Sequence, residues 1–171
     1  ILLMIDEVQT GNGRTGDLYA YMHYGIQPDV VTTAKGLGGG LPIGAALLGE
    51  KVQDTLTPGD HGSTFGGNPV CCAGAVSILE RLDTAFLQEV QQKSAYVFNE
   101  LKDAPGVKAV SGRGLMIGIL PEKPAGEVVA ECLKNGVLCL TAHDRVRLLP
   151  ALNIPMSVLK EAVAILKAAL S

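Results

Sequence analysis

Residues 28–40, with the sequence PDVVTTAKGLGGG, contain a short β-branched run that ends just before a lysine and a cluster of glycines. Val30–Thr33 is therefore predicted to be a strand, with Lys35 just past its carboxyl end. An earlier apolar run, Ile1–Ile5, ends in a similar way at Asp6. Unbroken apolar strands of this kind are typical of an α/β fold, and they predict a parallel sheet that is covered on both faces.

The same pattern of short apolar runs continues to about residue 82. Ile43–Leu48 is a third predicted strand, and Leu18–Tyr24 is a predicted helix between the first two strands. Another helix is predicted to begin at Pro69 behind Asn68, because proline fits the first turn and asparagine accepts hydrogen bonds from the free amides there. We expect that helix to end near Leu82.

Residues 83–171 have a different pattern, in which short helices and strands of an α+β unit follow one another. Helical spacing of apolar residues predicts helices over Leu87–Leu101 and Gly126–Asn135, and a last helix that opens at Pro155. The predicted strands are Val107–Val110, Leu115–Leu120, Val137–Leu140 and Val146–Leu149. We therefore expect two domains, residues 1–82 with the parallel-rich sheet and residues 83–171 as a smaller α+β domain.

The composition argues against several classes of partner. Of the 171 residues, 47% are hydrophobic and 18% are charged, which suits a folded chain with a buried core. The formal net charge of −3 gives no basic footprint for nucleic acid, and no apolar run approaches the ~18 residues of a membrane span. His61 and His143 have no partners at metal-ligand spacing. We expect no nucleic acid, membrane or metal as a partner.

The cysteines and the first residues add two expectations. No two of the four cysteines form a CxxC pair, which favours reduced thiols in a cytoplasmic protein. The chain opens on an apolar run without an initiator methionine or the basic lead of a signal peptide. We therefore expect it to be a fragment of a longer protein, entered midway through a strand.

Residues 11–16, with the sequence GNGRTG, match the GxGxxG pattern of dinucleotide-binding loops. Five residues separate Ile5 from the first glycine, whereas that fingerprint places its tight turn directly at the strand end. The next strand should also end in an acidic residue that binds the ribose, yet Val30–Thr33 leads to Lys35. A nucleotide-binding module is therefore the weakest of the functional hypotheses.

Asp6 and Lys35 each follow a predicted strand, at the edge where open α/β sheets bind their ligands. Each residue alone is more often a partner in a surface salt bridge than a catalyst. Together they match the needs of pyridoxal 5′-phosphate (PLP), which forms a Schiff base with a lysine and requires an acid beside its pyridine nitrogen. The pair therefore predicts a PLP site.

Three blocks of the sequence resemble the signature of the class III PLP-dependent aminotransferases. They are residues 6–16 (DEVQTGNGRTG), 28–45 (PDVVTTAKGLGGGLPIGA) and 61–69 (HGSTFGGNP), with a weaker match at residues 146–152 (VRLLPAL). The residues of these blocks are most similar to those of acetylornithine aminotransferases, and the resemblance covers about the C-terminal half of such a protein. It implies the fold of the PLP-dependent transferases of fold type I. Residues 1–82 would belong to the large PLP-binding domain, and residues 83–171 would form the small C-terminal domain.

The resemblance also implies roles for four residues of the first two blocks. Lys35 would form the Schiff base with PLP and then act as general acid and base. Asp6 would pair with the pyridine nitrogen, Val8 would pack against the ring, and Gln9 would hydrogen-bond the ring hydroxyl. Without the family, Val8 would be assigned to the core and Gln9 to loop backbone.

Three further residues take their implied roles from the later blocks. Thr64 would hold the cofactor phosphate of the neighbouring subunit in a homodimer with shared active sites, and Ser63 would lie beside it near the substrate. Arg147 would bind the substrate carboxylate through its two-pronged guanidinium. Arg145 is a neighbouring competitor for this role, and Arg147 could instead be an edge residue that reaches to water.

The reaction implied by the resemblance transfers the δ-amino group of N2-acetylornithine to 2-oxoglutarate in arginine biosynthesis. Ornithine, succinylornithine and 4-aminobutyrate are alternative donors, and a structural module without catalysis is an alternative of another class. The family's glycine-rich phosphate cup and the aromatic ring that stacks on PLP are not found in these 171 residues. We therefore expect the chain alone to bind PLP weakly and to have negligible transaminase activity.

Overall fold

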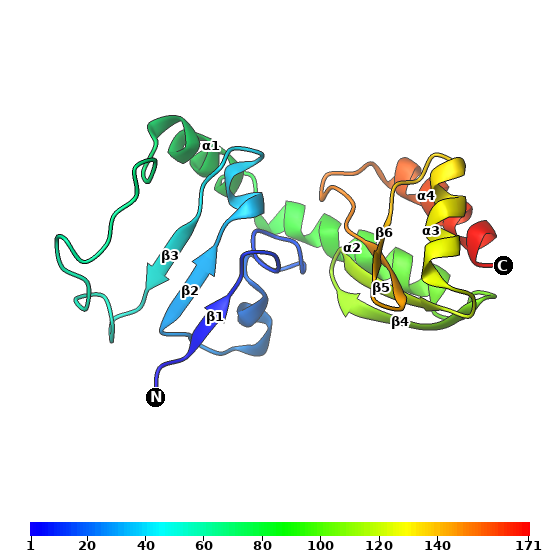
Figure 1. Ribbon diagram of the computed structural model, residues 1–171, viewed down its shortest axis with the longest axis horizontal. Coiled ribbons are helices and arrows are strands. Elements are labelled where there is room, and N and C mark those ends of the chain that lie inside the picture. Colours follow the sequence, from blue (N-terminus) through cyan, green and yellow to red (C-terminus); the bar gives the residue numbers. More distant parts are fainter. The chain divides into compact units, whose positions relative to one another are not determined.

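The computed structural model describes all 171 residues, which form two compact units, Ile1–Leu87 and Gln88–Ser171. The first unit contains a three-stranded sheet in the order β1-β2-β3, made of β1 (Met4–Asp6), β2 (Val30–Thr33) and β3 (Ala45–Leu48). β1 and β2 run parallel, whereas β2 and β3 run antiparallel, as the arrows in Figure 1 show. The unit combines strands and helices as an α/β fold does, but its sheet is mixed.

The direction of β3 corrects the expectation of a parallel sheet in this part of the chain. A parallel neighbour needs a crossover of a dozen or more residues, usually with a helix. Only residues 34–44 connect β2 to β3, and they contain the short 3₁₀ helix η2 (Lys35–Gly38). The chain therefore returns beside β2 in the opposite direction.

The burial of these strands also differs from the expectation. Leu3 and Met4 are 43% and 67% exposed, and three of the four residues of β3 are exposed. Their apolar side chains were predicted to be covered on both faces, but of the strand residues in this unit only Val31 and Thr33, both in the central strand β2, are buried. A sheet of three strands with one long helix has too few layers to cover both faces.

Two helical predictions in the first unit have different outcomes. The segment predicted as a helix over Leu18–Tyr24 forms only the 3₁₀ helix η1 (Ala20–Tyr24), which ends at Gly25. Helix α1 (Pro69–Leu79) begins as predicted, because Asn68 Oδ1 accepts hydrogen bonds from two free amides of its first turn. It ends three residues before Leu82.

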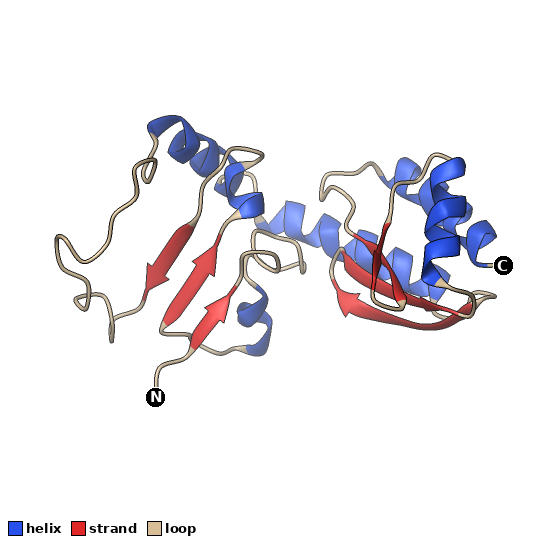
Figure 2. Cartoon of the chain, viewed as in Figure 1, coloured by secondary structure: helices blue, strands red, loops and turns tan.

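The second unit has a four-stranded antiparallel sheet in the order β4-β5-β7-β6. Its strands are β4 (Val107–Arg113), β5 (Met116–Pro121), β6 (Leu140–Ala142) and β7 (Arg145–Leu148). Its helices are α3 (Ala125–Lys134), α4 (Met156–Leu170) and the part of α2 (Thr84–Leu101) from Gln88 onward. Helix α3 packs against α4 and against β5, β6 and β7 (Figure 2). The core is formed by fully buried side chains, among them Leu101, Ile117, Ile119, Val128, Val146 and Leu166.

The strand predicted over Val137–Leu140 begins later, at Leu140. Gly136 adopts φ +86° after α3, and the Val137 amide donates to the Cys132 carbonyl at 2.9 Å. That bond satisfies a carbonyl of the last helical turn, so Val137 belongs to the helix cap and not to the sheet. None of the helices combines the length and the apolar character that crossing a membrane requires.

Candidate active site

The carboxyl ends of β1 and β2 lie side by side and place Asp6 next to Thr32 in the parallel register. Asp6 Oδ1 accepts hydrogen bonds from the Val8 amide at 2.9 Å and from Thr32 Oγ1 at 3.2 Å. Both bonds use the same oxygen, and the residue is exposed. The second oxygen, Oδ2, is therefore available to a donor outside the chain.

Lys35 lies three residues beyond Thr32 and opens η2 at the same edge of the sheet. Its backbone has φ +47°, in the left-handed region that residues other than glycine rarely adopt. The exposed side chain reaches back across the edge, and its Nζ donates to Gln9 Oε1 at 3.5 Å. A contact of this length is weak, so the amine is accessible to a ligand.

The loop that follows β1 is held by the buried carboxylate of Glu7, which is only 1% exposed. Its Oε1 accepts from the Tyr21 amide at 2.9 Å, and its Oε2 accepts from the Thr10 hydroxyl. Burial, followed by the charges of Tyr19 and Glu7, raises the pKa of Tyr21. Glu7 therefore orients the strand end and the loop instead of facing a substrate.

Asn12 is a residue of this site that the sequence did not single out. It is 4% exposed, and its Nδ2 donates to Thr33 Oγ1 at 2.9 Å and to the Ala34 carbonyl at 3.1 Å. Its left-handed backbone, with φ +54°, could have been predicted in part, because asparagine between two glycines favours a left-handed turn. Its partners lie 21 and 22 residues away, and no local pattern predicts them.

The structure brings Asp6, Val8, Gln9 and Lys35 to one edge of the first unit but not the two residues of the third block. Val8 is half-buried beside Asp6. Ser63 and Thr64 are exposed in the segment between β3 and α1, and no hydrogen bond joins them to the other four. The Ser63 carbonyl accepts a hydrogen bond from the Gly66 amide at 3.3 Å, within the same segment.

Arg147 lies in the second unit, in the middle of β7, between Gly118 of β5 and Leu140 of β6. Arg145 projects from the same face of the strand, because successive side chains alternate between faces. Its guanidinium donates to Ser111 Oγ at 3.3 Å, whereas that of Arg147 forms no hydrogen bond or ion pair. Of the two, Arg147 is the arginine that is free to take a ligand.

The chemistry of the first-unit cluster fits PLP. An accessible amine and a carboxylate with a free oxygen stand on neighbouring strand ends, with a half-buried apolar side chain and an amide beside them. These groups match the aldehyde, the pyridine nitrogen, the ring face and the ring hydroxyl of that cofactor. No group of three or more histidine, cysteine or acidic side chains is arranged to hold a metal ion, and all four cysteines are free thiols.

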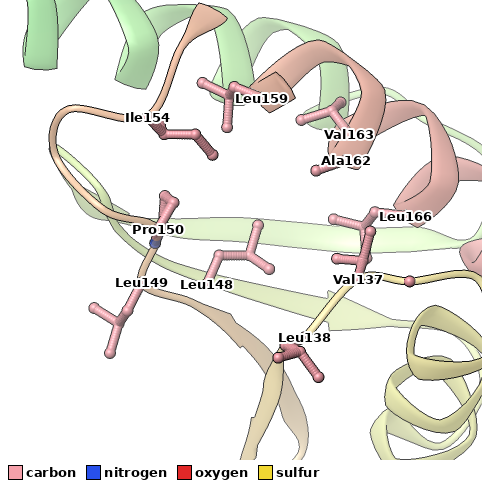
Figure 3. Close-up of a pocket in the computed structure, with 11 residues that line it drawn as sticks. Val137, Leu138, Leu148, Leu149, Pro150, Ile154, Leu159, Ala162, Val163 and Leu166 are labelled. Atoms are coloured by element: carbon pink, nitrogen blue, oxygen red, sulfur yellow. The ribbon is translucent and has the colours of Figure 1, made fainter. Parts of the chain in front are cut away.

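The second unit also has a hollow of about 250 Å³, shown in Figure 3. It lies between α4 and the segments on either side of β6 and β7, and all its lining residues are apolar or glycine. Leu148, Leu149 and Pro150, which follow Arg147, form part of one wall. Because it contains no titratable or nucleophilic side chain, it is not a catalytic site.

Comparison with known proteins places the same two units in one family. The family model of the class-III aminotransferases matches residues 1–170. The acetylornithine aminotransferase of Haemophilus ducreyi is 52% identical over 173 residues, and the one of Bacillus subtilis is 43% identical over 175 residues. These matches cover 100% and 99% of this chain, but only 44% and 46% of the relatives.

Two solved structures resemble the whole chain. The acetylornithine aminotransferase of Elizabethkingia anophelis has a TM-score of 0.91 at 33% identity, over 99% of this chain and 45% of its own. The ornithine aminotransferase of Toxoplasma gondii has a TM-score of 0.92 at 34% identity, over 99% of this chain and 43% of its own. The chain therefore has the aminotransferase fold and spans less than half the length of these relatives.

Proposed function

The chain belongs to the class-III aminotransferase family, and from this premise we propose that it supplies the lysine-bearing part of a PLP-dependent transaminase. The observation that carries the proposal is the placement of the Asp6 carboxylate and the Lys35 amine at the carboxyl ends of adjacent parallel strands. The proposal assigns residues 1–82 to the large PLP-binding domain and residues 83–171 to the small C-terminal domain.

Each residue of the cluster has a task that its position allows. When bound, PLP withdraws electrons from the substrate carbon that carries the amino group. Asp6 Oδ2 holds the proton on the pyridine nitrogen, while Oδ1 is kept in place by Val8 and Thr32. Lys35 Nζ holds the cofactor and then moves the proton at the substrate carbon. Val8 packs against the ring, and Gln9 binds its hydroxyl.

Ser63 and Thr64 act in a composite site of a homodimer in this proposal. Their exposure in the first unit, without contacts to Lys35, supports a role toward a second copy of the chain. Thr64 would donate to the cofactor phosphate of that copy, with Ser63 near the substrate. Arg147 binds the substrate carboxylate, which its unpaired guanidinium and planar geometry support.

The proposed substrates are N2-acetylornithine and 2-oxoglutarate, which yield N-acetylglutamate semialdehyde and glutamate in arginine biosynthesis. Relatives named acetylornithine aminotransferases, at 43–52% identity, support this donor. Ornithine is the second candidate, because ornithine aminotransferases are among the similar structures. A cytoplasmic location completes the proposal, and the four free thiols support it.

Covalent labelling tests the cofactor site. The chain, and the full-length protein, are incubated with PLP, reduced with borohydride, digested and analysed by mass spectrometry. We expect a phosphopyridoxyl label at Lys35 that is lost in Lys35→Ala, with weaker labelling in the isolated chain than in the full-length protein. A label scattered over surface lysines of the full-length protein would refute the aminotransferase assignment.

Turnover with competing donors tests the substrate. The full-length protein is assayed with 2-oxoglutarate and with N2-acetylornithine, ornithine, succinylornithine or 4-aminobutyrate, and kcat/KM is compared. We expect the highest value for N2-acetylornithine, a large loss in Arg147→Gln and a small loss in Arg145→Gln. A higher value for ornithine would replace the donor and leave the cofactor assignment intact.

A further inference from the structure

The loop of residues 11–16 matches a nucleotide-binding pattern, but in the folded chain it packs against the turn that carries Lys35. Asn12 is the contact, through its two hydrogen bonds to Thr33 and Ala34. A Cβ on Gly36 would lie 3.3 Å from Asn12 Cβ, so the loop also touches the backbone after the lysine. Asn12 therefore contacts the chain on both sides of Lys35.

Asn12 can influence the direction of the lysine side chain through the Ala34 carbonyl, which belongs to the peptide group that precedes Lys35. This oxygen accepts from Asn12 Nδ2 at 3.1 Å and from the Leu37 amide at 3.0 Å. Because a peptide group is planar, fixing the carbonyl also fixes the nitrogen of Lys35. The φ of +47° at Lys35 is sparsely populated and persists only where its surroundings hold it.

The orientation of the Asn12 amide shows which of its groups matters. Its Oδ1 is buried and has no hydrogen-bond partner, which is unfavourable for folding. Turning the amide by half a turn would place Oδ1 against the Ala34 carbonyl, two acceptors face to face. The observed orientation leaves one acceptor unpaired and keeps the donor on Ala34.

Close packing and hydrogen bonds within residues 7–18 hold the loop of residues 11–16 in place. A Cβ on Gly11 would lie 2.8 Å from the Glu7 carbonyl, so only glycine allows this close return of the chain. The Gly13 amide donates to the Leu18 carbonyl at 3.3 Å, and Thr15 Oγ1 donates to the Thr10 carbonyl at 3.2 Å. The close return at Gly11 and the bond of the Gly13 amide hold Asn12 at its place relative to β1, whereas the Thr15 bond closes the loop without reaching the lysine turn.

We propose that Asn12 is a positioning residue for Lys35, which aims the amine toward the cofactor by holding the Ala34 carbonyl. The inference rests on the proposed function, because it gives Lys35 a cofactor to meet. The buried Asn12 amide bonds Thr33 and Ala34, so in this proposal it acts only through Lys35. Its effect is on the rate and selectivity with which the amine reacts.

Two substitutions at Asn12 and one matched control test the proposal in the chain. Asn12→Asp keeps the shape and sets an acceptor against the Ala34 carbonyl, while Asn12→Gly keeps the left-handed backbone and removes the amide. Thr15→Val removes a hydrogen bond of the same loop that does not reach the lysine turn. The two readouts are the ratio of PLP labelling at Lys35 to that at the exposed Lys108, and hydrogen exchange of the Leu37 amide.

Loss of the hydrogen bond to the Ala34 carbonyl, which both Asn12 variants share, should lower the labelling ratio roughly tenfold. Exchange at the Leu37 amide should rise, and Thr15→Val should leave both readouts near those of the parent chain. An unchanged labelling ratio in the Asn12 variants, or an equal fall in Thr15→Val, would overturn the proposal. If the unsubstituted chain and the full-length protein lack selective labelling at Lys35, the proposed function itself fails, whereas Leu37 exchange still reports on the Asn12 contact.

Discussion

Replacement of Gly39 by alanine should destabilise the first unit by about 2 kcal/mol, because two costs add at the end of η2. Gly39 has φ +60°, where a residue with a Cβ loses about 1 kcal/mol. Its new Cβ would also lie 2.7 Å from Ile78 Cδ1 and 2.8 Å from Ile78 Cγ1 on α1. Ile78 is half-buried and its side chain can shift, so the overpacking cost is at the lower end, about 1 kcal/mol.

Gly25 provides the matched control for this prediction. It also ends a 3₁₀ helix, has φ +62°, and a Cβ there would meet nothing within 4 Å. Gly25→Ala should therefore lose only the backbone part, about 1 kcal/mol. Urea unfolding followed by tyrosine fluorescence measures both variants, since three of the four tyrosines lie at positions 19, 21 and 24. Equal losses in the two variants would refute the packing of α1 on the lysine turn.

Three further predictions follow from single contacts. Asn68→Ala should lower the free energy of unfolding by about 1 kcal/mol through loss of the α1 cap, measured by the same urea titration. Hydrogen bonds from Lys51 and from a backbone amide lower the pKa of Asp29. The ionised Asp29 therefore stabilises the folded chain fully above the ordinary carboxyl pKa, and this contribution is lost as the pH falls through the lowered pKa. Thermal melts from neutral to acid pH should show that loss in the parent chain and not in Asp29→Asn. Burial, reinforced by Cys132, raises the pKa of the Cys139 thiol to about 12. Iodoacetamide at pH 8 should therefore modify Cys139 only after unfolding, which mass spectrometry of the digested chain measures.

The strand that carries the lysine was predictable because its sequence is locally unambiguous. The β-branched run of β2 is bounded by Asp29 and by a glycine-rich segment, and the observed strand matches the predicted Val30–Thr33 at both ends. The cap of α1 was predictable for the same reason, since proline after asparagine meets the needs of a helix start. The placement of Asp6 and Lys35 at one edge then follows from the parallel pairing of β1 with β2.

Properties that depend on distant partners were not predictable. The apolar residues of β1 and β3 predicted burial, but burial depends on which layers surround the sheet, and this chain supplies few. The direction of β3 depends on the length of its connection to β2, which apolar periodicity does not encode. Val137 was assigned to a strand by its side chain, whereas its amide is used by the cap of α3.

The match of residues 11–16 to GxGxxG shows why spacing alone does not determine function. In a dinucleotide-binding loop, the glycines allow the backbone to approach a pyrophosphate. Here Gly11 allows the backbone to approach the Glu7 carbonyl and the Tyr19 ring, and the space is filled by the chain itself. The two uses share a need for close backbone approach, so they select the same residue type. The two kinds of loop differ in the neighbour that the backbone approaches. In this chain the residue after Gly11, Asn12, donates from its side-chain amide to the Ala34 carbonyl, directly before Lys35.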